Sequence, residues 1–310
     1  MRNALLKEVI MTNTTEIPNI VSQISFLYVE HAYIHVKDSA ILIIKGNTKT
    51  PVPSYSLACL ILGPGTSITH AAITALQGSG CLVCWEGENQ KTFYAYGMEE
   101  NRKSKNFLKQ IDYYSNQELH MRVVKKMYAK RFSDISLDRK SLTQLRGMEG
   151  IRVRDQYKEI AEKYGVEWSG RKYNSDDWES MDFQNQAIII GNKLLYNICH
   201  TVILALGYSA TVGFIHTGTM RAFVYDLADL YKLDYVITPV FKAISEGAIE
   251  PEEIRTVIRK EIYTKKLIQQ IVNDLGWLFE ESNMPLVNEQ GLWDTKQNIV
   301  PFGKNWGDDK

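Results

Sequence analysis

Hydrophobic and polar residues follow a strand-like pattern in the first third of the chain and a helix-like pattern in the rest. Short runs of β-branched, aromatic and aliphatic residues between 24 and 97 are separated by turn formers such as Gly46-Asn47. The runs predict strands over residues 24–29, 32–36, 40–44, 57–62, 81–85 and 91–96. The sequence therefore predicts a small β-rich N-terminal domain.

After Gly97 the apolar positions recur every three to four residues, which is typical of helices packed on one face. This spacing predicts helices over 102–131, 141–165, 182–206, 241–246 and 252–276. The second of these begins with a capping box, Ser141 with Gln144, and Gly165 is placed to end it. The expected fold class is α+β, with a β-sandwich-like domain over 21–98 and a larger all-α domain over 99–282. Residues 1–20 are expected to be a partly flexible leader, and residues 283–310 a flexible tail.

The most apolar stretch, residues 187–206, is interrupted by Asn192, Lys193, Asn197 and His200, which indicates a core helix rather than a membrane span. The chain has 36 basic and 36 acidic residues, so the formal net charge gives no information about nucleic-acid binding. Cys81 and Cys84 have no second cysteine pair to complete a zinc site. The N-terminus lacks an apolar run of signal-peptide length, so we expect reduced thiols and a cytoplasmic location.

The segment 213–229 combines a turn with a helix that carries acidic residues in or beside its apolar stripe. Its turn contains His216, and a helix that starts near Met220 places Asp226 and Asp229 on one flank. Singly, a loop histidine or a helical Asp-x-x-Asp pair is usually an ordinary surface feature. Together, carboxylates that face a core require pairing, hydrogen bonds or a bound cation, which makes this segment a candidate site.

A second carboxylate, Glu149, lies in the apolar stripe of the capped helix, between Leu145 and Val153. Gly147 and Gly150 flank it, although each helical glycine costs about 1 kcal/mol relative to alanine. Their presence predicts that another chain segment or a ligand approaches closely here. The alternative is a buried glutamate paired with Arg146 or Arg152.

The region around Glu149 is strongly basic. Residues 121–154 contain ten Lys or Arg residues against three acidic ones. Arg146 and Arg152 belong to this run. Such an excess of positive charge suits a phosphate backbone, so we expect both arginines to bind DNA.

Several motifs in the same order resemble one known family over about residues 20–260. It is the CRISPR-associated endonuclease and integrase, the first of the numbered Cas proteins, in its I-E subtype. The segments that carry the likeness are LY at 27–28, PGT at 64–66, HAA at 70–72, QLRGMEG at 144–150, RVR at 152–154, YGVEWSGRKY at 164–173, DW at 177–178, GFIHTG at 213–218 and FVYDLAD at 223–229.

The resemblance implies a catalytic helical domain that holds Mg²⁺ or Mn²⁺ through Glu149, His216 and Asp229, with no organic cofactor. Asp226 matches a further acidic position and Tyr196 an active-site tyrosine. For DNA, the resemblance points to Tyr28 at the fork, to aromatics along the path and to basic positions: Tyr173, Trp178, Arg146 and Lys232. One departure is Lys91-Thr92, where relatives place an arginine.

The implied function is CRISPR spacer acquisition, in which 3′-OH ends of foreign DNA are joined to the CRISPR repeat by transesterification. The implied partners are double-stranded and forked DNA (prespacer and repeat), a second copy of the chain, and a dimer of the second numbered Cas protein. No membrane partner is expected. Whether His216 binds metal or acts as a general base stays open. The alternatives are a non-catalytic DNA-binding scaffold and a generic metal-dependent phosphodiesterase.

Overall fold

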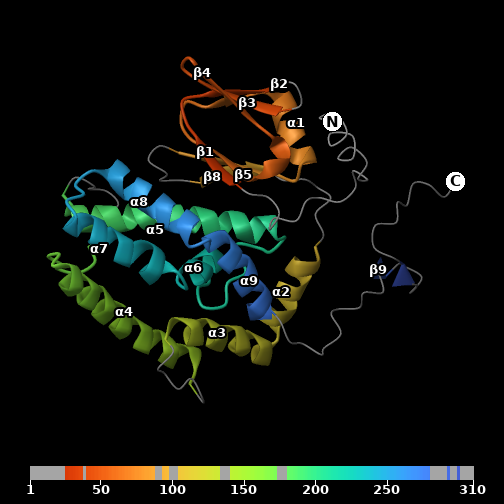
Figure 1. Cartoon of the computed structure of the whole chain (residues 1–310). Helices are drawn as coiled ribbons and strands as arrows, with labels where there is room; N and C mark the ends of the chain where they lie inside the picture. Colours follow the sequence, from red (N-terminus) through yellow and green to blue (C-terminus); the bar gives the residue numbers. More distant parts are fainter. Residues whose placement is uncertain are drawn as a thin grey trace, which may run out of the picture.

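The computed structural model describes residues 25–37, 40–87, 93–97, 104–132, 140–172, 180–279, 292–293 and 299–300 (Figure 1). The predicted leader, residues 1–20, lies outside the described residues. So does most of the predicted tail, of which only β9 (Leu292–Trp293) and its antiparallel partner β10 (Ile299–Val300) are described.

The N-terminal domain consists of two four-stranded sheets, which confirms the β-sandwich-like prediction. One sheet has the order β1-β5-β7-β8, with β1, β5 and β7 parallel, and the other has the order β4-β3-β2-β6. The strands are β1 (Ser25–Val29), β2 (Tyr33–Lys37), β3 (Ala40–Lys45), β4 (Thr48–Val52), β5 (Leu57–Leu62), β6 (Ser67–Ile68), β7 (Leu82–Glu86) and β8 (Phe93–Gly97).

Apolar side chains from both sheets and from α1 (His70–Gly78) form the core of this domain. Ile34, Leu60 and Leu76 are among its fully buried members. Thr69 begins α1 by accepting a hydrogen bond from the backbone N–H of Ala72, as the hydroxyl-rich turn before it leads one to expect.

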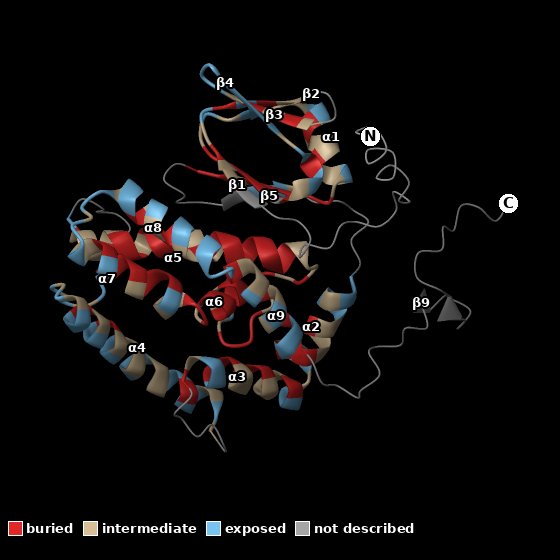
Figure 2. Cartoon of the chain, in the orientation of Figure 1, coloured by how far each residue is buried: buried red, intermediate tan, exposed pale blue. Residues whose placement is uncertain are grey.

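The described residues between 104 and 279 are mainly helical and form one large apolar core (Figure 2). Its helices are α2 (Lys105–Ser115), α3 (Gln117–Arg131), α4 (Leu142–Tyr164), α5 (Phe183–Ala205), α6 (Ala222–Ala228), the π-helix η3 (Leu233–Ile237), α7 (Thr238–Ser245), α8 (Pro251–Thr264) and α9 (Leu267–Phe279).

Two predicted helices are each divided into two. The predicted helix 102–131 breaks at Asn116, whose backbone is extended and whose side chain caps α3. The predicted helix 252–276 breaks at Lys266, a residue with a φ of 52°. Apolar spacing continues through both breaks, so periodicity alone did not reveal them. Helix α4 has the predicted capping box and ends at Gly165 in the left-handed conformation.

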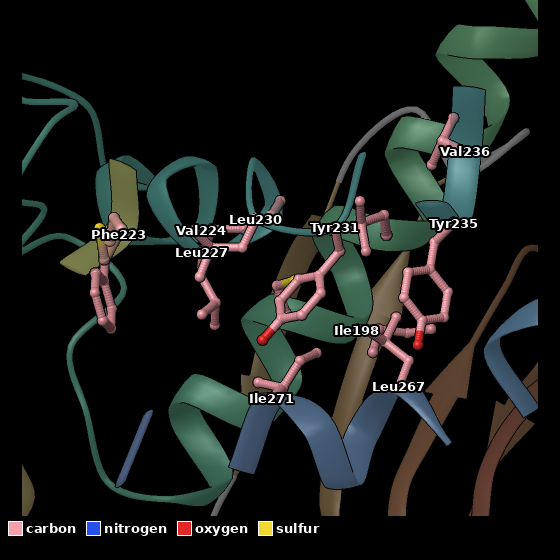
Figure 3. Close-up of a cluster of buried hydrophobic side chains, with 14 of the residues drawn as sticks. Ile198, Phe223, Val224, Leu227, Leu230, Tyr231, Tyr235, Val236, Leu267 and Ile271 are labelled. Atoms are coloured by element: carbon pink, nitrogen blue, oxygen red, sulfur yellow. The ribbon is translucent and has the colours of Figure 1, made fainter. Parts of the chain in front are cut away.

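Helix α5 is buried over most of its length (Figure 2), and its Ile198 lies among apolar side chains of η3 and α9 (Figure 3). It packs tightly on η3 at Gly191, where an added Cβ would lie 2.6 Å from Val236 Cγ1. Within the described chain α5 alone has the length and hydropathy of a membrane span, and most of that stretch is buried inside the protein. This agrees with the core helix that the sequence predicts.

The two domains meet along the C-terminal half of α5. Leu204 packs in one cluster with Cys59, Ile61, Leu82 and Cys84 of the sheet that contains β5 and β7. All four cysteines are buried and form no disulfide, although the Cys59 thiol lies 3.7 Å from Cys84 Sγ. The boundary is therefore mainly apolar, which makes the polar side chains that it contains conspicuous.

Candidate active site

Asp226 holds the turn that leads into α6. Its carboxylate is 1% exposed and accepts hydrogen bonds from three consecutive backbone N–H groups, those of Phe214, Ile215 and His216. The distances are 2.5, 3.0 and 2.7 Å. A buried carboxylate satisfied in this way fixes the backbone of the turn.

Asp226 also fixes the ring of His216. The two side chains meet through His216 Nδ1 and Asp226 Oδ1, 2.7 Å apart, so Nδ1 carries the donated hydrogen. This hydrogen bond raises the pKa of His216 above its ordinary value, against the opposing effect of burial. The arrangement leaves Nε2 as the ring nitrogen that can bind a cation or move a proton.

Glu149 of α4 and Asp229, at the end of α6, meet around one guanidinium. Arg131 Nη1 lies 2.5 Å from Glu149 Oε1 and 3.7 Å from Asp229 Oδ2. Neither contact has the alignment of a hydrogen bond, so Arg131 acts there as a point charge. The second oxygen of Glu149 accepts a hydrogen bond from the Tyr128 hydroxyl at 2.6 Å. Segments 80 residues apart in the chain thus bring two acids to one cation.

Lys232 completes the ion pairs of Asp229. Its Nζ lies 2.5 Å from Asp229 Oδ1 and 5.0 Å from the ring centroid of Tyr196. Burial disfavours the charge of Asp229, yet Lys232 and Arg131 hold its pKa below the ordinary value. Burial likewise opposes the charge of Lys232, but Asp229 and Tyr196 raise its pKa. Both groups are therefore charged at neutral pH.

A cavity of about 230 Å³ lies between α3, α4 and the α6–η3 segment, next to these ion pairs. Glu149, Asp229 and Asp234 line it together with four cationic side chains: Lys130, Arg131, Arg171 and Lys232. A cavity lined by both acids and several cations suits a phosphodiester and a divalent cation.

The donor set fits a hard divalent cation. Glu149 and Asp229 already enclose a positive charge, and oxygen ligands with one imidazole suit Mg²⁺ or Mn²⁺. His216 is near enough to act on the charge of Asp229. In the part of the chain that the structure describes, no three potential ligands are gathered closely enough to hold a metal ion as they stand. The cations in contact with the two carboxylates are instead the side chains of Arg131 and Lys232.

Comparison with known proteins identifies the family. The family described as "CRISPR associated protein Cas1" matches residues 128–275. The protein named CRISPR-associated endonuclease Cas1 2 of Thermus thermophilus is 37% identical over 308 residues, 96% of this chain and 94% of the relative. CRISPR-associated endonuclease Cas1 of Geobacter sulfurreducens is 38% identical, over 93% of this chain and 94% of its own.

The chain belongs to the Cas1 family. Among solved structures, the crystal structure of the TtCas1–DNA complex superimposes with a TM-score of 0.69 and 38% identity, covering 84% of this chain and 98% of that one. Relatives of this chain are thus named endonucleases, and one solved neighbour is bound to DNA.

In this Cas1 family member, other predicted site residues lie around the cavity or apart from it. Tyr196 lies beside Lys232, as described above. Arg146 is exposed on α4, and Arg152 packs over the Phe132 ring at 5.3 Å. Tyr28 lies on β1 and lines a separate cleft of about 750 Å³ between the domains, where Arg259 lies over its ring. Tyr173, Trp178, Lys91 and Thr92 lie outside the described residues.

Two details of this region qualify the expectations. The partner of Glu149 is Arg131 of α3 rather than Arg146 or Arg152. The acid-bearing helix begins at Ala222, close to the predicted start near Met220. No other described segment comes within 4 Å of where a Cβ would sit on Gly147 or Gly150, so the close approach of a ligand there stays a prediction.

Sequence reasoning did not identify Arg131 or Tyr128 as site residues of this Cas1 chain. Both lie near the end of α3, inside the basic run, and no local spacing distinguishes them from their neighbours. The available signal was helical periodicity: Tyr128 and Arg131 are three residues apart, so they share a face and can reach one partner.

Proposed function

We propose that this Cas1 protein is a divalent-metal-dependent DNA endonuclease and integrase of CRISPR spacer acquisition. The observation that carries the proposal is that Glu149 and Asp229 meet around a positive charge and line one cavity with several cations. Asp226 fixes the His216 ring, whose charge acts on Asp229. This arrangement matches what phosphodiester transesterification requires.

Strand transfer needs a 3′-hydroxyl and a phosphodiester placed in line, and stabilisation of the negative charge that develops on the phosphate. The cationic side chains around the cavity hold the phosphate, foremost Lys232 and Arg131. The neutral His216 ring, with Nδ1 bonded to Asp226, can accept a proton at Nε2. Glu149, His216 and Asp229 would hold the metal ion. When bound, that ion lowers the pKa of the attacking hydroxyl and stabilises charge on the phosphate.

Partners of this chain are proposed from its motifs. Tyr28 in the interdomain cleft suits a base-stacking contact at a DNA fork, because an aromatic face stacks on any base. The motifs favour the I-E subtype, a homodimer, a dimer of the second numbered Cas protein and a cytoplasmic location. The DNA in the TtCas1 complex supports DNA binding by this chain.

A non-catalytic DNA-binding scaffold is the alternative that one observation favours. In such a protein the acids would only neutralise nearby arginines, and Glu149 and Asp229 do contact Arg131. These groups line a cavity, which argues against a purely structural role, because a scaffold has no need to open this ion pair to substrate. Metal dependence of strand transfer separates the two functions.

The test is integration of a labelled duplex with free 3′-OH ends into a supercoiled plasmid, with and without the second numbered Cas protein, in Mg²⁺, Mn²⁺ or chelator. Wild type should give product with either metal and none with chelator. Glu149→Gln keeps the side-chain volume and should lower strand transfer by about 10³-fold, with duplex binding retained. Product in chelator, or wild-type rates from Glu149→Gln, would contradict the proposed function.

A further inference from the structure

A buried carboxylate lies at the otherwise apolar boundary between the two domains. Glu86 is the last residue of β7 and is 4% exposed. Asn197 of α5 donates a hydrogen bond to the Glu86 carboxyl, and Arg221 is the positive charge that acts on it. No donor among the described residues reaches its second oxygen, Oε1. Burial raises the pKa of Glu86 to about 7, although Arg221 and Asn197 oppose this rise.

Burying this carboxylate between the domains costs free energy that an apolar contact would not. Beside it, Leu204 already packs on apolar side chains of the sheet. An incompletely paired buried acid costs more than an apolar residue of similar size. The role of Glu86 must therefore be sought in the side chain that it holds, Arg221.

Arg221 connects Glu86 to the active-site turn. It immediately precedes α6, and its Nη2 donates to Asn197 Oδ1 at 3.3 Å. Its guanidinium lies over the rings of Tyr196 and Tyr225, with distances of 5.7 and 6.0 Å to their centroids. Cation–π contacts of this kind are stronger when they are shielded from water.

The two tyrosines continue the chain of contacts to the catalytic histidine. Tyr196 and Tyr225 pack edge-on with centroids 5.1 Å apart, and Tyr225 packs edge-on against His216 at 5.9 Å. Asp226 fixes one side of the His216 ring, and Tyr225 lies against the ring itself. The contacts thus run from Glu86 through Asn197, Arg221 and Tyr225 to His216.

We propose that Arg221, held across the domain boundary by Glu86 and Asn197, is a positioning residue for His216 and Tyr196. It orders the aromatic wall on which both depend and couples that wall to the β-rich domain. Glu86 and Tyr28 belong to the same sheet, so the coupling also ties the fork-binding face to the catalytic turn. This inference rests on the proposed function for its kinetic part.

A direct phosphate contact by Arg221 does not explain the geometry as well. Its Nε is buried, and no acceptor among the described residues reaches it. Its Nη2 points into the protein toward Asn197. Two aromatic rings lie against the guanidinium. A side chain placed to bind DNA would direct these donors to solvent, as Arg146 on the exposed face of α4 can.

The experiment compares Arg221→Met, Arg221→Lys and Glu86→Gln with wild type in the full-length chain. Three quantities are measured: the kcat of strand transfer, the Kd for duplex, and the NMR resonance of the His216 ring without DNA. Arg221→Met should lower kcat by about tenfold or more, the scale expected for a misplaced catalytic group. It should leave the duplex Kd unchanged and shift the His216 resonance. Glu86→Gln should change kcat and the resonance in the same direction but less, and Arg221→Lys should restore part of both.

Thr201→Val is the matched control. Thr201 is a buried α5 residue whose hydroxyl lies 3.8 Å from Cys59 Sγ across the same boundary, and it donates to the backbone carbonyl of Asn197 rather than to the Asn197 side chain that holds Arg221. This variant should lower the melting temperature but keep wild-type kcat and the His216 resonance. A kcat loss in Thr201→Val that matches Arg221→Met would overturn the positioning role, because it would show a general effect of interdomain packing.

An unchanged kcat with an unmoved His216 resonance in Arg221→Met would also overturn the inference. If Arg221→Met does not fold, Arg221→Lys and Glu86→Gln decide by the same two readouts. If wild type shows no strand transfer, the proposed function fails, and the His216 resonance still tests the contact chain by itself.

Discussion

Asp226 and Asp229 lie three residues apart at the end of one short helix, yet their partners are of opposite kinds. Asp226 receives three backbone N–H groups and the His216 ring, all fixed in place by the turn. Asp229 has two mobile side-chain cations, Lys232 and Arg131. Asp226 is wholly enclosed, whereas Asp229 lines the cavity.

This difference gives the two aspartates of one motif separate roles, one structural and one chemical. Backbone donors cannot leave Asp226 without unfolding the turn, so no incoming ion can take their place. Side-chain cations can swing away from Asp229 by rotamer changes, which makes this carboxylate and Glu149 the ones able to exchange a protein cation for a metal ion. We therefore propose that Asp226 shapes the turn, and that Glu149 and Asp229 are the carboxylates that bind the ion together with His216.

Asp226→Asn should have the largest effect on stability. The amide keeps one oxygen, but its NH₂ group faces at least one backbone N–H, so a buried donor loses its acceptor. We expect the free energy of unfolding to fall by about 3 kcal/mol, the scale for lost hydrogen bonds to a buried charge. Urea unfolding measures it. Asp229→Asn, whose side chain faces the cavity, should cost clearly less, and equal losses would remove the contrast between the two carboxylates.

Arg131→Met should have a smaller effect, seen in metal affinity rather than in stability. Removing the guanidinium takes away a positive charge in contact with both carboxylates, so the Kd for Mn²⁺ should fall by about tenfold. Electron paramagnetic resonance of free Mn²⁺ in a DNA-free titration measures it. Weaker Mn²⁺ binding would show that Arg131 organises the acids instead of competing with the ion.

Lys232→Met is the matched comparison for Arg131→Met. Lys232 contacts Asp229 but not Glu149, so its removal should tighten Mn²⁺ binding less, by about threefold. A larger effect of Lys232 than of Arg131 would place the ion nearer to Asp229 alone than to the pair.

The fold and much of this site could be predicted from the sequence because their signals are local. Strand-like runs before Gly97 and helical spacing after it separated the two domains. The capping box located α4, whose apolar stripe contains Glu149. The sequence pattern also placed Asp226 and Asp229 on one helix after a histidine turn. It could not assign their different roles, since both occupy the same flank and their partners come from the folded chain.

Contacts between distant segments had no such signal. Arg131 is one of ten basic residues in its stretch, and only the packing of α3 against α4 selects it as the partner of Glu149. Glu86 ends a strand that is otherwise apolar, and Arg221 lies in a turn 135 residues later. Their link through Asn197 depends on how the domains dock, which residue spacing does not encode.

The most direct test of this account is Mn²⁺ binding to the DNA-free protein, followed by electron paramagnetic resonance in wild type, Asp229→Asn and Asp226→Asn below their melting temperatures. We predict that Asp229→Asn loses the tight site and that Asp226→Asn keeps one tight ion per chain. Tight binding retained in Asp229→Asn, or lost only in Asp226→Asn, would contradict the assignment of the ion to Glu149 and Asp229.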